Sequence, residues 1–362
     1  MKRIIFTVTN DLNYDQRMQR ICNSLCRAGF EVLLAGRKRK QSKPLTQQPF
    51  NQKRFNCIFE KGKLFYIEYN LRLFFFLLFA NCDIISAVDL DTILTCSLIS
   101  TLRHKTCVYD AHEYFPEVPE VINRKFTQSV WSWIEGVTVP NVDVCYTVSE
   151  GLKTIFEQKY NKPFTVIRNL PVLQELTQSK TREKIILYQG ALNQGRGLEQ
   201  TIEAMQQIDA QLLLAGDGDI TNDLMKRVVD LKLESKVKFF GYVLPADLKQ
   251  LTQQATIGIN VLEHTGESYY HSLPNKVFDY IQAGVPSVNM DFPEMKKLNE
   301  QYHIGILINE CTPVAIADAV NNLLNNQQLY DELQKNCLAA RLELNWQNEE
   351  NKLIALYTPF KG

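Results

Sequence analysis

Short strand-like runs of β-branched and apolar residues alternate with helix-like periodicity along the whole chain. In the first half these runs are Ile4–Val8, Glu31–Ala35, Ile84–Ala87, Cys107–Tyr109 and Val144–Thr147. In the second half they are Lys184–Tyr188, Gln211–Ala215, Val237–Phe240, Ile257–Val261, Pro286–Val288 and Gly305–Leu307. Strands that alternate with helices are typical of parallel sheets with helices on both faces. The sequence therefore predicts an α/β protein.

A polar stretch at residues 174–183 separates the two series of strands. With 362 residues, the chain is longer than one hydrophobic core usually serves. We therefore expect two Rossmann-like domains, residues 1–172 and 173–340, which face a central cleft, and a helical segment at 341–362. Open α/β sheets bind ligands at the carboxyl ends of their strands, so functional residues are expected in the loops after the strands.

Composition and charge exclude several classes of protein. Forty basic and 40 acidic residues give no net charge, which argues against a nucleic-acid-binding protein. The nine cysteines include no CxxC pair, so neither a disulfide framework nor a zinc site is expected, and a cytoplasmic protein fits. Residues 1–180 carry 24 Lys and Arg against 17 Asp and Glu, a difference of +7. This excess indicates either an anionic partner or an ordinary solvated surface.

Leu71–Ala80 (LRLFFFLLFA) is the most apolar run of the chain. It is shorter than the roughly 20 residues that a membrane-spanning helix needs. A buried helix is the favoured interpretation. The alternative is an interfacial helix, with the basic residues of 37–43 as contacts for lipid headgroups, on the inner face of the plasma membrane.

The segment 272–286 (SLPNKVFDYIQAGVP) carries the richest set of polar residues. Pro274 and Asn275 are typical of a helix start, and spacings of three and four residues put Asn275, Lys276 and Asp279 on one side of that helix. A helix N-terminus and the charge of Lys276 favour an anion, while Asp279 is suited to accept hydrogen bonds from a sugar diol. The alternative is a capped surface helix with an internal Lys276–Asp279 pair.

Glycine-containing loops follow three strand-like runs of the second half. Arg196 lies in QGALNQGRG just before a helix, where a guanidinium can grip phosphate oxygens. The glycines allow backbone to approach a base or ribose closely, although each loop also fits an ordinary turn. They are Gly195, Gly216, Gly218 and Gly241.

In the first half, Asp110, His112 and Glu113 follow the strand-like run Cys107–Tyr109. At the carboxyl end of a strand they are expected to reach the ligand, and His112 is suited to orient an acceptor or to hydrogen-bond a sugar. Asn10 follows the first strand and is expected at the same edge. Asp89-Leu90-Asp91 matches the DxD pattern of metal-dependent sugar transfer, but a role without metal is favoured because no further metal-binding cluster accompanies it.

Taken in order, these motifs resemble the family 4 retaining glycosyltransferases of the GT-B fold. The match is best from Tyr188 to Ala319 and includes LYQGALNQGRGLEQTIEAM, LLLAGDGDI, VKFFGYV and SLPNKVFDYIQAGVPSV. DLDTIL and VYDAHEYFPEVPE resemble the first domain of a bacterial branch that often makes surface polysaccharides. The resemblance implies a GT-B protein whose C-terminal helix, here 341–362, returns to the N-terminal domain.

The resemblance also implies roles for individual residues. Arg196 stands at the position of a phosphate-binding lysine, and Asp279 at that of a glutamate that binds the nucleotide ribose. Gly216 and Gly218 match the loop beside the base, and His112 matches a residue near the transferred sugar.

The chain departs from the family pattern at three places. His271 stands eight positions before Asp279, where a glutamate usually contacts the donor sugar. Ala191 replaces an arginine, and Thr9-Asn10-Asp11 replaces a glycine pair. These three departures leave open which donor sugar the chain binds and whether it has the activity of the family.

The implied function is a hexosyltransferase. It would move a sugar with retention from a UDP- or GDP-type nucleotide sugar to a glycan or lipid-linked glycan acceptor in surface-polysaccharide synthesis. Arg196, Lys276 and the helix end at Asn275 would stabilise the leaving diphosphate without a metal or other cofactor. Two alternatives stay open: a catalytically inactive GT-B protein that binds nucleotide or glycan and assists a partner, and a GT-B nucleotide-sugar epimerase.

Overall fold

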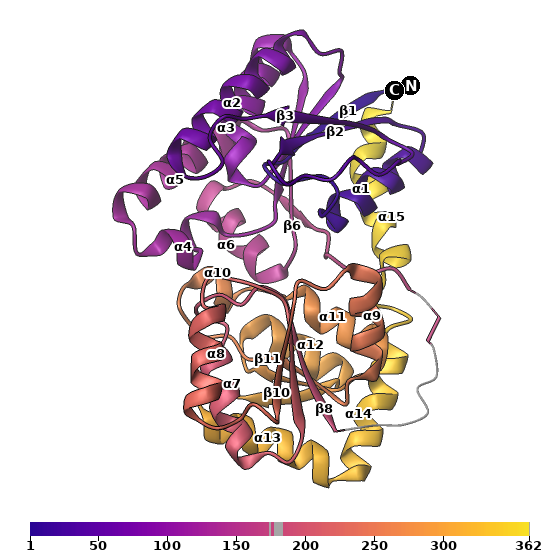
Figure 1. Ribbon diagram of the computed structural model, residues 1–362. Helices are drawn as coiled ribbons and strands as arrows, with labels where there is room; N and C mark the ends of the chain where they lie inside the picture. The colour runs from indigo at the N-terminus through magenta and orange to yellow at the C-terminus, as the bar shows by residue number, and fades with distance from the viewer. Residues whose placement is uncertain (174, 177–183, 362) are drawn as a thin grey trace. The chain divides into compact units, whose positions relative to one another are not determined.

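The computed structural model describes residues 1–173, 175–176 and 184–361, which form two compact units (Figure 1). Unit 1 contains Met1–Asn169 and Glu349–Gly362, and unit 2 contains Leu170–Asn348. The sequence analysis placed these divisions after residues 172 and 340 instead. The expected linker, residues 174–183, lies outside the described residues except for Glu175 and Leu176.

Unit 1 is built on a parallel sheet of seven strands in the order β3-β2-β1-β4-β5-β6-β7. Its strands are β1 (Arg3–Thr7), β2 (Glu31–Lys38), β3 (Asn51–Asn56), β4 (Ile84–Val88), β5 (Thr106–Ala111), β6 (Val144–Thr147) and β7 (Phe164–Val166). Its helices are α1 (Gln16–Arg27), α2 (Gly62–Phe79), α3 (Leu90–Arg103), α4 (Pro119–Ile122), α5 (Lys125–Thr138) and α6 (Glu150–Tyr160), with short 3-10 turns at Phe115–Glu117 and Val139–Asn141.

The two faces of this sheet are covered by different helices. Ile5 and Ile85 point from β1 and β4 into a core shared with α2, α3 and α5. On the opposite face α1 packs beside the C-terminal helix α15 (Trp346–Tyr357), where Ser24 donates a hydrogen bond to Glu350. Alternation of side chains along each strand supplies both cores, because successive residues point to opposite faces.

The end of α15 belongs to unit 1. Leu353 and Tyr357 are fully buried, and the Tyr357 ring lies 6.1 Å from the ring of Phe6 and 6.3 Å from that of Phe30. The Tyr357 hydroxyl is 3.1 Å from Ser86 Oγ of β4. The expectation that the C-terminal helix returns to the N-terminal domain is therefore confirmed.

Unit 2 repeats the arrangement with six parallel strands in the order β10-β9-β8-β11-β12-β13. They are β8 (Ile185–Gln189), β9 (Gln211–Ala215), β10 (Val237–Gly241), β11 (Ile257–Asn260), β12 (Ser287–Met290) and β13 (Gly305–Ile308). One face carries α7 (Leu198–Ala204), α8 (Thr221–Asp230) and α13 (Pro313–Asn325), with a 3-10 turn at Met205–Gln207 after α7. The other carries α9 (Pro245–Gln254), α11 (Asn275–Ala283) and α14 (Gln327–Ala340), with α10 (Glu267–Tyr270) and α12 (Pro293–Tyr302) in the connections. Both units are Rossmann-like domains, as predicted.

The sequence missed two strands, β3 and β7, and both lie at edges of the first sheet. β3 reads NQKRFN, with only Phe55 buried, so it lacks the apolar pattern of a core strand. β7 has three residues, too few for a pattern to emerge.

The expectation of a buried helix at Leu71–Ala80 is correct for one side of α2 only. Leu73 and Leu77 are buried, whereas Leu71, Phe75 and Phe79 are exposed. Within the described ranges, none of the helices combines the length and the hydropathy that crossing a bilayer requires.

Candidate functional site

The strand order of unit 2 changes direction between β8 and β11, which lie side by side at the centre of the sheet. In open α/β sheets such a point is where ligands bind, outside the carboxyl ends of the strands. The loop after β8 leads to Arg196, and the segment after β11 leads to α10. Tight packing joins these two segments, because a Cβ on Gly197 would lie 2.1 Å from the carbonyl oxygen of Val261.

The loops that follow β8 and β9 also pack closely on each other. A Cβ on Gly216, whose φ is +155°, would lie 1.8 Å from the carbonyl oxygen of Gly190. A Cβ on Gly218 would lie 2.4 Å from the carbonyl oxygen of Leu192. Gly216 also forms a bridge to Gly241 at the end of β10. Gly216, Gly218 and Gly241, which the sequence singled out, therefore lie in adjoining loops at the carboxyl edge.

Two cations lie at this edge, Lys276 in the first turn of α11 and Arg196 before α7. Lys276 is buried, and its Nζ lies 3.8 Å from the centre of the Tyr188 ring. Burial first, and then the charge of Arg196, lower the pKa of Lys276 well below its usual value. The guanidinium of Arg196 stacks 4.9 Å from the centre of the Tyr269 ring. The structure thus brings the two predicted phosphate ligands together.

These cations have aromatic neighbours instead of acidic ones. Among the residues that the structure describes, neither Lys276 nor Arg196 forms an ion pair, and Lys276 Nζ has no hydrogen-bond partner. The internal Lys276–Asp279 pair considered from the sequence is absent from the described residues. A buried ammonium without a partner is costly, so the site is suited to an anion that supplies the missing charge.

Asp279 is held by Gln189, the last residue of β8. Gln189 Nε2 donates to Asp279 Oδ2 at 2.8 Å, and Gln189 Oε1 accepts from the Thr252 hydroxyl at 2.8 Å. Asn275 is exposed at the start of α11, and Pro274 precedes it as the N-cap residue with an extended backbone and no side-chain cap. The helix end predicted from the sequence therefore begins where expected.

His271 lies just after α10. Its Nε2 is 3.1 Å from Glu267 Oε2, and its ring meets the Tyr270 ring edge-on at 5.1 Å. Gly195 lies nearby in the β8 loop, where an added Cβ would come within 3.3 Å of the Tyr269 ring. The position occupied by glutamate in the related family is thus a histidine that contacts an acid one helical turn earlier.

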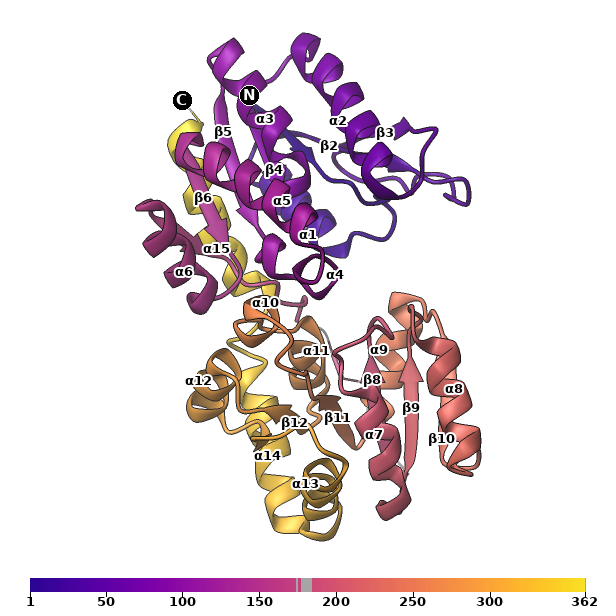
Figure 2. The same ribbon diagram turned by 90° about the vertical axis from the view of Figure 1, so that its left-hand side faces the viewer.

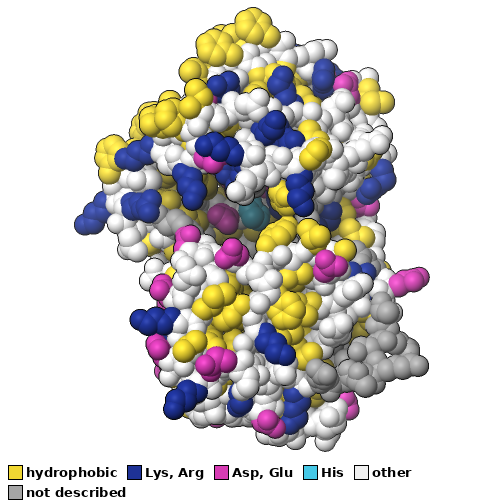
Figure 3. All heavy atoms as spheres, viewed as in Figure 1, with side chains coloured by type: hydrophobic (Ala, Val, Ile, Leu, Met, Phe, Trp, Pro, Cys, Tyr) yellow, Lys and Arg dark blue, Asp and Glu magenta, His cyan; other side chains and the backbone are white. Residues whose placement is uncertain are grey.

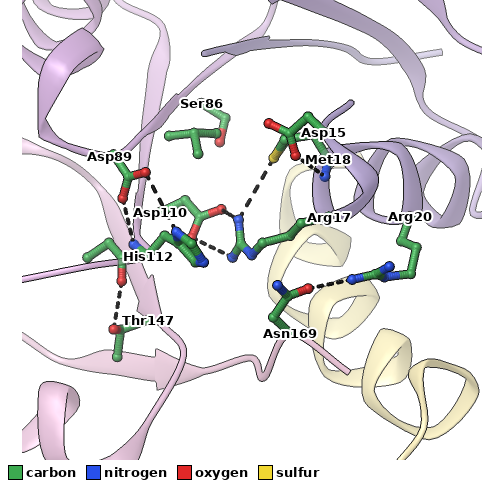
Figure 4. A network of polar contacts seen from close by, with 12 residues as sticks. Asp15, Arg17, Met18, Arg20, Ser86, Asp89, Asp110, His112, Thr147 and Asn169 are labelled. Carbon is green, nitrogen blue, oxygen red and sulfur yellow. Dashed lines mark hydrogen bonds and ion pairs between the residues drawn. The ribbon is translucent and has the colours of Figure 1, made fainter. Parts of the chain in front are cut away.

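In unit 1 the strand order changes direction between β1 and β4, and near that edge Asp110 and His112 lie close to Arg17 and Asp89 (Figure 4). Asp89 follows β4 and accepts a hydrogen bond from the backbone N–H of His112 at 3.0 Å. His112 Nδ1 lies 3.8 Å from Asp89 Oδ2. Burial disfavours the charged imidazolium, but the contact with Asp89 and its negative charge outweigh burial and raise the pKa of His112 above its usual value.

Asp89 has a φ of +58°, a backbone conformation that residues other than glycine rarely adopt. Such strain costs on the order of 1–3 kcal/mol and persists where the surroundings impose it. Here it lets the carboxylate reach both the N–H and the ring of His112.

Asp110 is fully buried in β5 and forms a bidentate ion pair with Arg17 of α1 (Figure 4). The Arg17 guanidinium donates to the two carboxylate oxygens at 2.5 and 2.7 Å. Because Arg17 occupies both carboxylate oxygens, Asp110 has a structural role below the carboxyl edge of the sheet.

Asn10 and Glu113 are exposed at this edge. Asn10 Nδ2 donates to Asp15 Oδ2 at 3.2 Å, and Asp15 caps α1 by accepting from the Met18 N–H. The negative charge of Glu113 contributes to the raised pKa of His112.

The sequence did not predict the contacts that four residues make at these sites: Tyr188, Gln189, Tyr269 and Asp89. Gln189 could have been found, because a polar residue that ends a buried strand lies at the carboxyl edge. The aromatic rings beside Lys276 and Arg196 left no such signal. Within the described ranges, no group of three or more His, Cys, Asp and Glu side chains is arranged to hold a metal ion.

Solved structures share this fold over the whole chain. A sucrose-phosphate synthase from Thermosynechococcus elongatus superimposes with a TM-score of 0.81 at 17% identity, covering 99% of both chains. HepE from Anabaena, solved in complex with UDP and glucose, superimposes with a TM-score of 0.79 at 14% identity, covering 99% of this chain and all of HepE. A putative UDP-N-acetylglucosamine 2-epimerase from Listeria monocytogenes gives 0.67 at 13% identity, covering 100% of this chain and 97% of that one. With its two parallel-sheet domains, the protein has the GT-B fold.

The family model that the sequence matches concerns unit 2. Residues 173–338 match the family model of glycosyl transferases group 1. An uncharacterised glycosyltransferase from Methanocaldococcus jannaschii is 26% identical over 180 residues, which are 48% of this chain and 45% of that protein. An alpha-D-kanosaminyltransferase from Streptomyces kanamyceticus is 22% identical over 244 residues, 62% of each chain. The matches thus span less than two thirds of either relative. Residues 173–338 are thus similar to the group 1 glycosyl transferases, and the whole chain shares the GT-B fold with solved structures.

Proposed function

We propose that this protein transfers a hexose, with retention of anomeric configuration, from a UDP- or GDP-type nucleotide sugar to a glycan or lipid-linked glycan in surface-polysaccharide synthesis. The observation that carries the proposal is the pair of cations at the carboxyl edge of unit 2. Lys276 is buried without a hydrogen-bond partner in the described residues, and Arg196 lies close enough to lower its pKa. A nucleoside diphosphate supplies the negative charge that this pair lacks.

Departure of the diphosphate is the step that the two cations assist. As the bond between the anomeric carbon and the diphosphate oxygen breaks, negative charge grows on that oxygen. Lys276, Arg196 and the N-terminus of α11 at Asn275 stabilise it in place of a metal ion. The acceptor hydroxyl forms the new bond to the anomeric carbon, and its proton passes to the leaving phosphate.

The remaining predicted residues handle the other parts of the substrates. Asp279, oriented by Gln189, accepts hydrogen bonds from the ribose hydroxyls. We place the backbone at Gly216, Gly218 and Gly241 against the base, since the bridge between Gly216 and Gly241 brings the loops after β9 and β10 side by side. HepE, a structural neighbour, binds UDP and glucose, which favours a nucleotide-sugar donor of this type.

We propose that His271, Gly195 and Pro274 of unit 2 contact the sugar of the donor. In unit 1, His112 is proposed to orient the acceptor. Asn10 and Glu113 are exposed beside His112 and are proposed to contact the acceptor, with Asp110 supporting them from below. We place the protein in the cytoplasm, where nucleotide sugars are available, with peripheral attachment to the inner face of the plasma membrane for a lipid-linked acceptor.

A screen of UDP- and GDP-sugars for released nucleotide tests this function, first with glycan acceptors and then with lipid-linked ones. Lys276→Ala and Arg196→Ala should each lower kcat/KM by about 100-fold or more, as loss of a group that stabilises developing charge does. Lys226→Ala, at an exposed lysine of α8, serves as the control and should match the wild type. If both site variants keep the wild-type kcat/KM, the assignment is wrong.

A nucleotide-sugar epimerase is the second candidate, because a putative epimerase shares the fold over the full chain. Product analysis without acceptor separates the two, since only an epimerase turns the donor alone into an isomeric nucleotide sugar. Nucleotide binding without turnover in either assay identifies an inactive binding protein, for which His271 in place of a glutamate is the supporting feature.

A further inference from the structure

Three helices of unit 1 present apolar side chains to solvent as well as to the core. Helix α3 packs against both α2 and α5, and together they cover one face of the sheet (Figure 2). Their inward residues form the core of unit 1. Their exposed apolar side chains, which we call the outer helix face, have no such role.

On α2 the exposed apolar residues form a stripe with a spacing of four. Ile67, Leu71, Phe75 and Phe79 follow one another along the solvent side, with Ile67 64% and Phe79 81% exposed. An ordinary surface helix carries polar residues on this side, since only its inward stripe packs against the core. The outward stripe of α2 therefore needs another explanation.

The other two helices extend the same surface. On α3, Leu94, Leu98 and Leu102 are exposed at a spacing of four, and on α5 Phe126 is 71% and Trp133 61% exposed. Figure 3 shows hydrophobic side chains gathered at the upper left edge, over the region of α2 and α5, with Lys and Arg beside them. Contiguous exposed apolar patches of this kind mark interaction sites, because solvation of large apolar areas is unfavourable.

The exposed charge around the outer helix face is positive. Lys61 and Lys63 lie at the N-terminal end of α2, and Arg124 and Lys125 at that of α5. These two ends meet, because Lys63 Nζ lies 4.6 Å from the centre of the Phe126 ring. The four basic residues thus form one group beside the apolar surface, which we call the basic end.

The acidic residues of these helices do not cancel this charge. Asp91 and Glu135 are buried. Glu68 pairs with Arg72 at 2.8 Å and accepts hydrogen bonds from the backbone N–H groups of Ile58 and Phe59. Just before α2, the exposed Glu60 accepts from the Lys40 N–H and keeps one negative charge, so positive charge remains in excess at the basic end.

We propose that the outer helix face and the basic end dock unit 1 onto an anionic lipid bilayer. The three helices lie in the plane of the interface, with their apolar side chains among the acyl chains and the basic end on phosphate headgroups. Each lysine or arginine near an anionic surface adds to the attraction. The inference rests on the proposed function in that a lipid-linked acceptor places the reaction at such a surface.

A second copy of this chain is the other occupant of such a surface. A symmetric dimer brings the same patch of each copy together. Burying both basic ends in one interface would take their positive charges out of water without acidic partners from these helices, which opposes association. Charge complementarity therefore favours the anionic bilayer.

Co-sedimentation with phosphatidylglycerol vesicles, compared with phosphatidylcholine vesicles, tests the proposal. The wild type should bind the anionic vesicles at least about tenfold better, with the difference falling as salt screens the charges. The variant Leu71→Gln, Phe75→Gln, Phe79→Gln should lose binding to both. The variant Lys61→Gln, Lys63→Gln, Arg124→Gln, Lys125→Gln should lose only the preference for anionic vesicles.

Matched controls come from exposed residues of unit 2. Val229→Gln, Val314→Gln, Leu342→Gln removes three exposed apolar side chains, and Lys226→Gln, Lys232→Gln, Lys238→Gln, Lys249→Gln removes four charges, so both should bind like the wild type. The proposal is overturned if the wild type sediments with neither vesicle, or if the unit 1 variants bind as it does. It is also overturned if sedimentation equilibrium shows a dimer that the apolar variant abolishes.

Nucleotide release measured without vesicles separates this inference from the proposed function. Lipid binding with no turnover of any donor leaves the docking surface in place and removes the enzyme assignment. Turnover of a donor with no lipid binding supports the enzyme assignment and overturns the docking surface.

Discussion

At the scale of single residues, Lys276 joins structure and function most directly. Burial and the neighbouring Arg196 lower its pKa, so the folded protein holds this lysine less strongly protonated than a free lysine. A bound diphosphate reverses the effect, because an adjacent negative charge favours the ammonium form. Donor binding and protonation of Lys276 are therefore linked.

The linkage predicts proton uptake when UDP binds. Above the lowered pKa of the free protein, each binding event should take up to one proton, and the Kd for UDP should rise by up to about tenfold per pH unit. Isothermal titration calorimetry between pH 7.5 and 9, in two buffers of different ionisation enthalpy, measures the uptake. Lys276→Arg, whose side chain stays charged, should bind without it. Equal proton uptake by variant and wild type would contradict the linkage.

In unit 1 the Asp89–His112 contact is the corresponding feature. Asp89→Asn keeps an acceptor for the His112 N–H but removes the negative charge, so burial should then lower the pKa of His112 below the ordinary value of about 6.5. In the wild type the raised pKa stabilises the fold below pH 6.5, and this stabilisation is lost as pH rises through the folded pKa. NMR titration of the histidine ring protons measures the pKa of His112 in the wild type and in the variant. The other four histidines of the chain are internal controls. An unchanged His112 titration would refute the role of Asp89.

At the scale of elements, the glycine loops after β8, β9 and β10 set the shape of the donor edge. Gly216 and Gly241 bridge each other, yet their surroundings differ. A Cβ on Gly216 would collide with the Gly190 carbonyl, whereas a Cβ on Gly241, at φ of +62°, meets nothing within 4 Å. The two positions therefore separate steric packing from backbone strain.

Gly241→Ala should cost about 1–2 kcal/mol of stability, the strain of a left-handed conformation alone. Gly216→Ala should cost more, about 3 kcal/mol or above, because the β8 loop must also move. Urea unfolding followed by hydrogen exchange of unit 2 peptides measures the difference. Gly136→Ala, in α5 with open space around it, serves as the control and should be stabilising by about 0.5–1 kcal/mol. Equal losses at Gly216 and Gly241 would contradict the argument.

Elements with a strong periodic pattern could be predicted from the sequence, and those without one could not. The spacing of Leu198, Ile202 and Met205, at i, i+4 and i+7, predicts that they share one helix face, and all three are buried. β3 was missed because an edge strand needs only one buried side chain, here Phe55. For Leu71–Ala80 the sequence left a buried and an interfacial helix open, because an almost wholly apolar run gives no sign of which side faces the core.

The candidate site divides in the same way. Lys276, Asp279 and the glycines follow strands or begin a helix, so local sequence suffices to place them at the edge. The partners that set their chemistry come from other strands and helices. Gln189 reaches Asp279 across 90 positions, and Arg17 reaches Asp110 across 93. Such pairs depend on the tertiary fold, which no local pattern reports.

At the scale of the whole molecule, the chain completes unit 1 with its last residues, after unit 2 has been built. Tyr357 closes the face opposite α2, α3 and α5, where it packs on Phe6 and Phe30 and its hydroxyl meets Ser86. Because a parallel sheet needs helices on both faces, unit 1 lacks part of its cover until α15 docks.

Tyr357→Ala should therefore destabilise unit 1 by about 3–5 kcal/mol, the cost of truncating a large buried aromatic side chain, and leave unit 2 unchanged. Tyr357→Phe should cost only about 1 kcal/mol, since it removes the hydrogen bond to Ser86 and keeps the packing. Hydrogen exchange distinguishes the units: protection should fall in peptides from β1, β2 and β4 and persist in those from β8, β9 and β11. Leu342→Ala, at an exposed position of unit 2, is the control. If protection falls equally in both units, the last helix stabilises the chain as a whole and not the N-terminal domain that it completes.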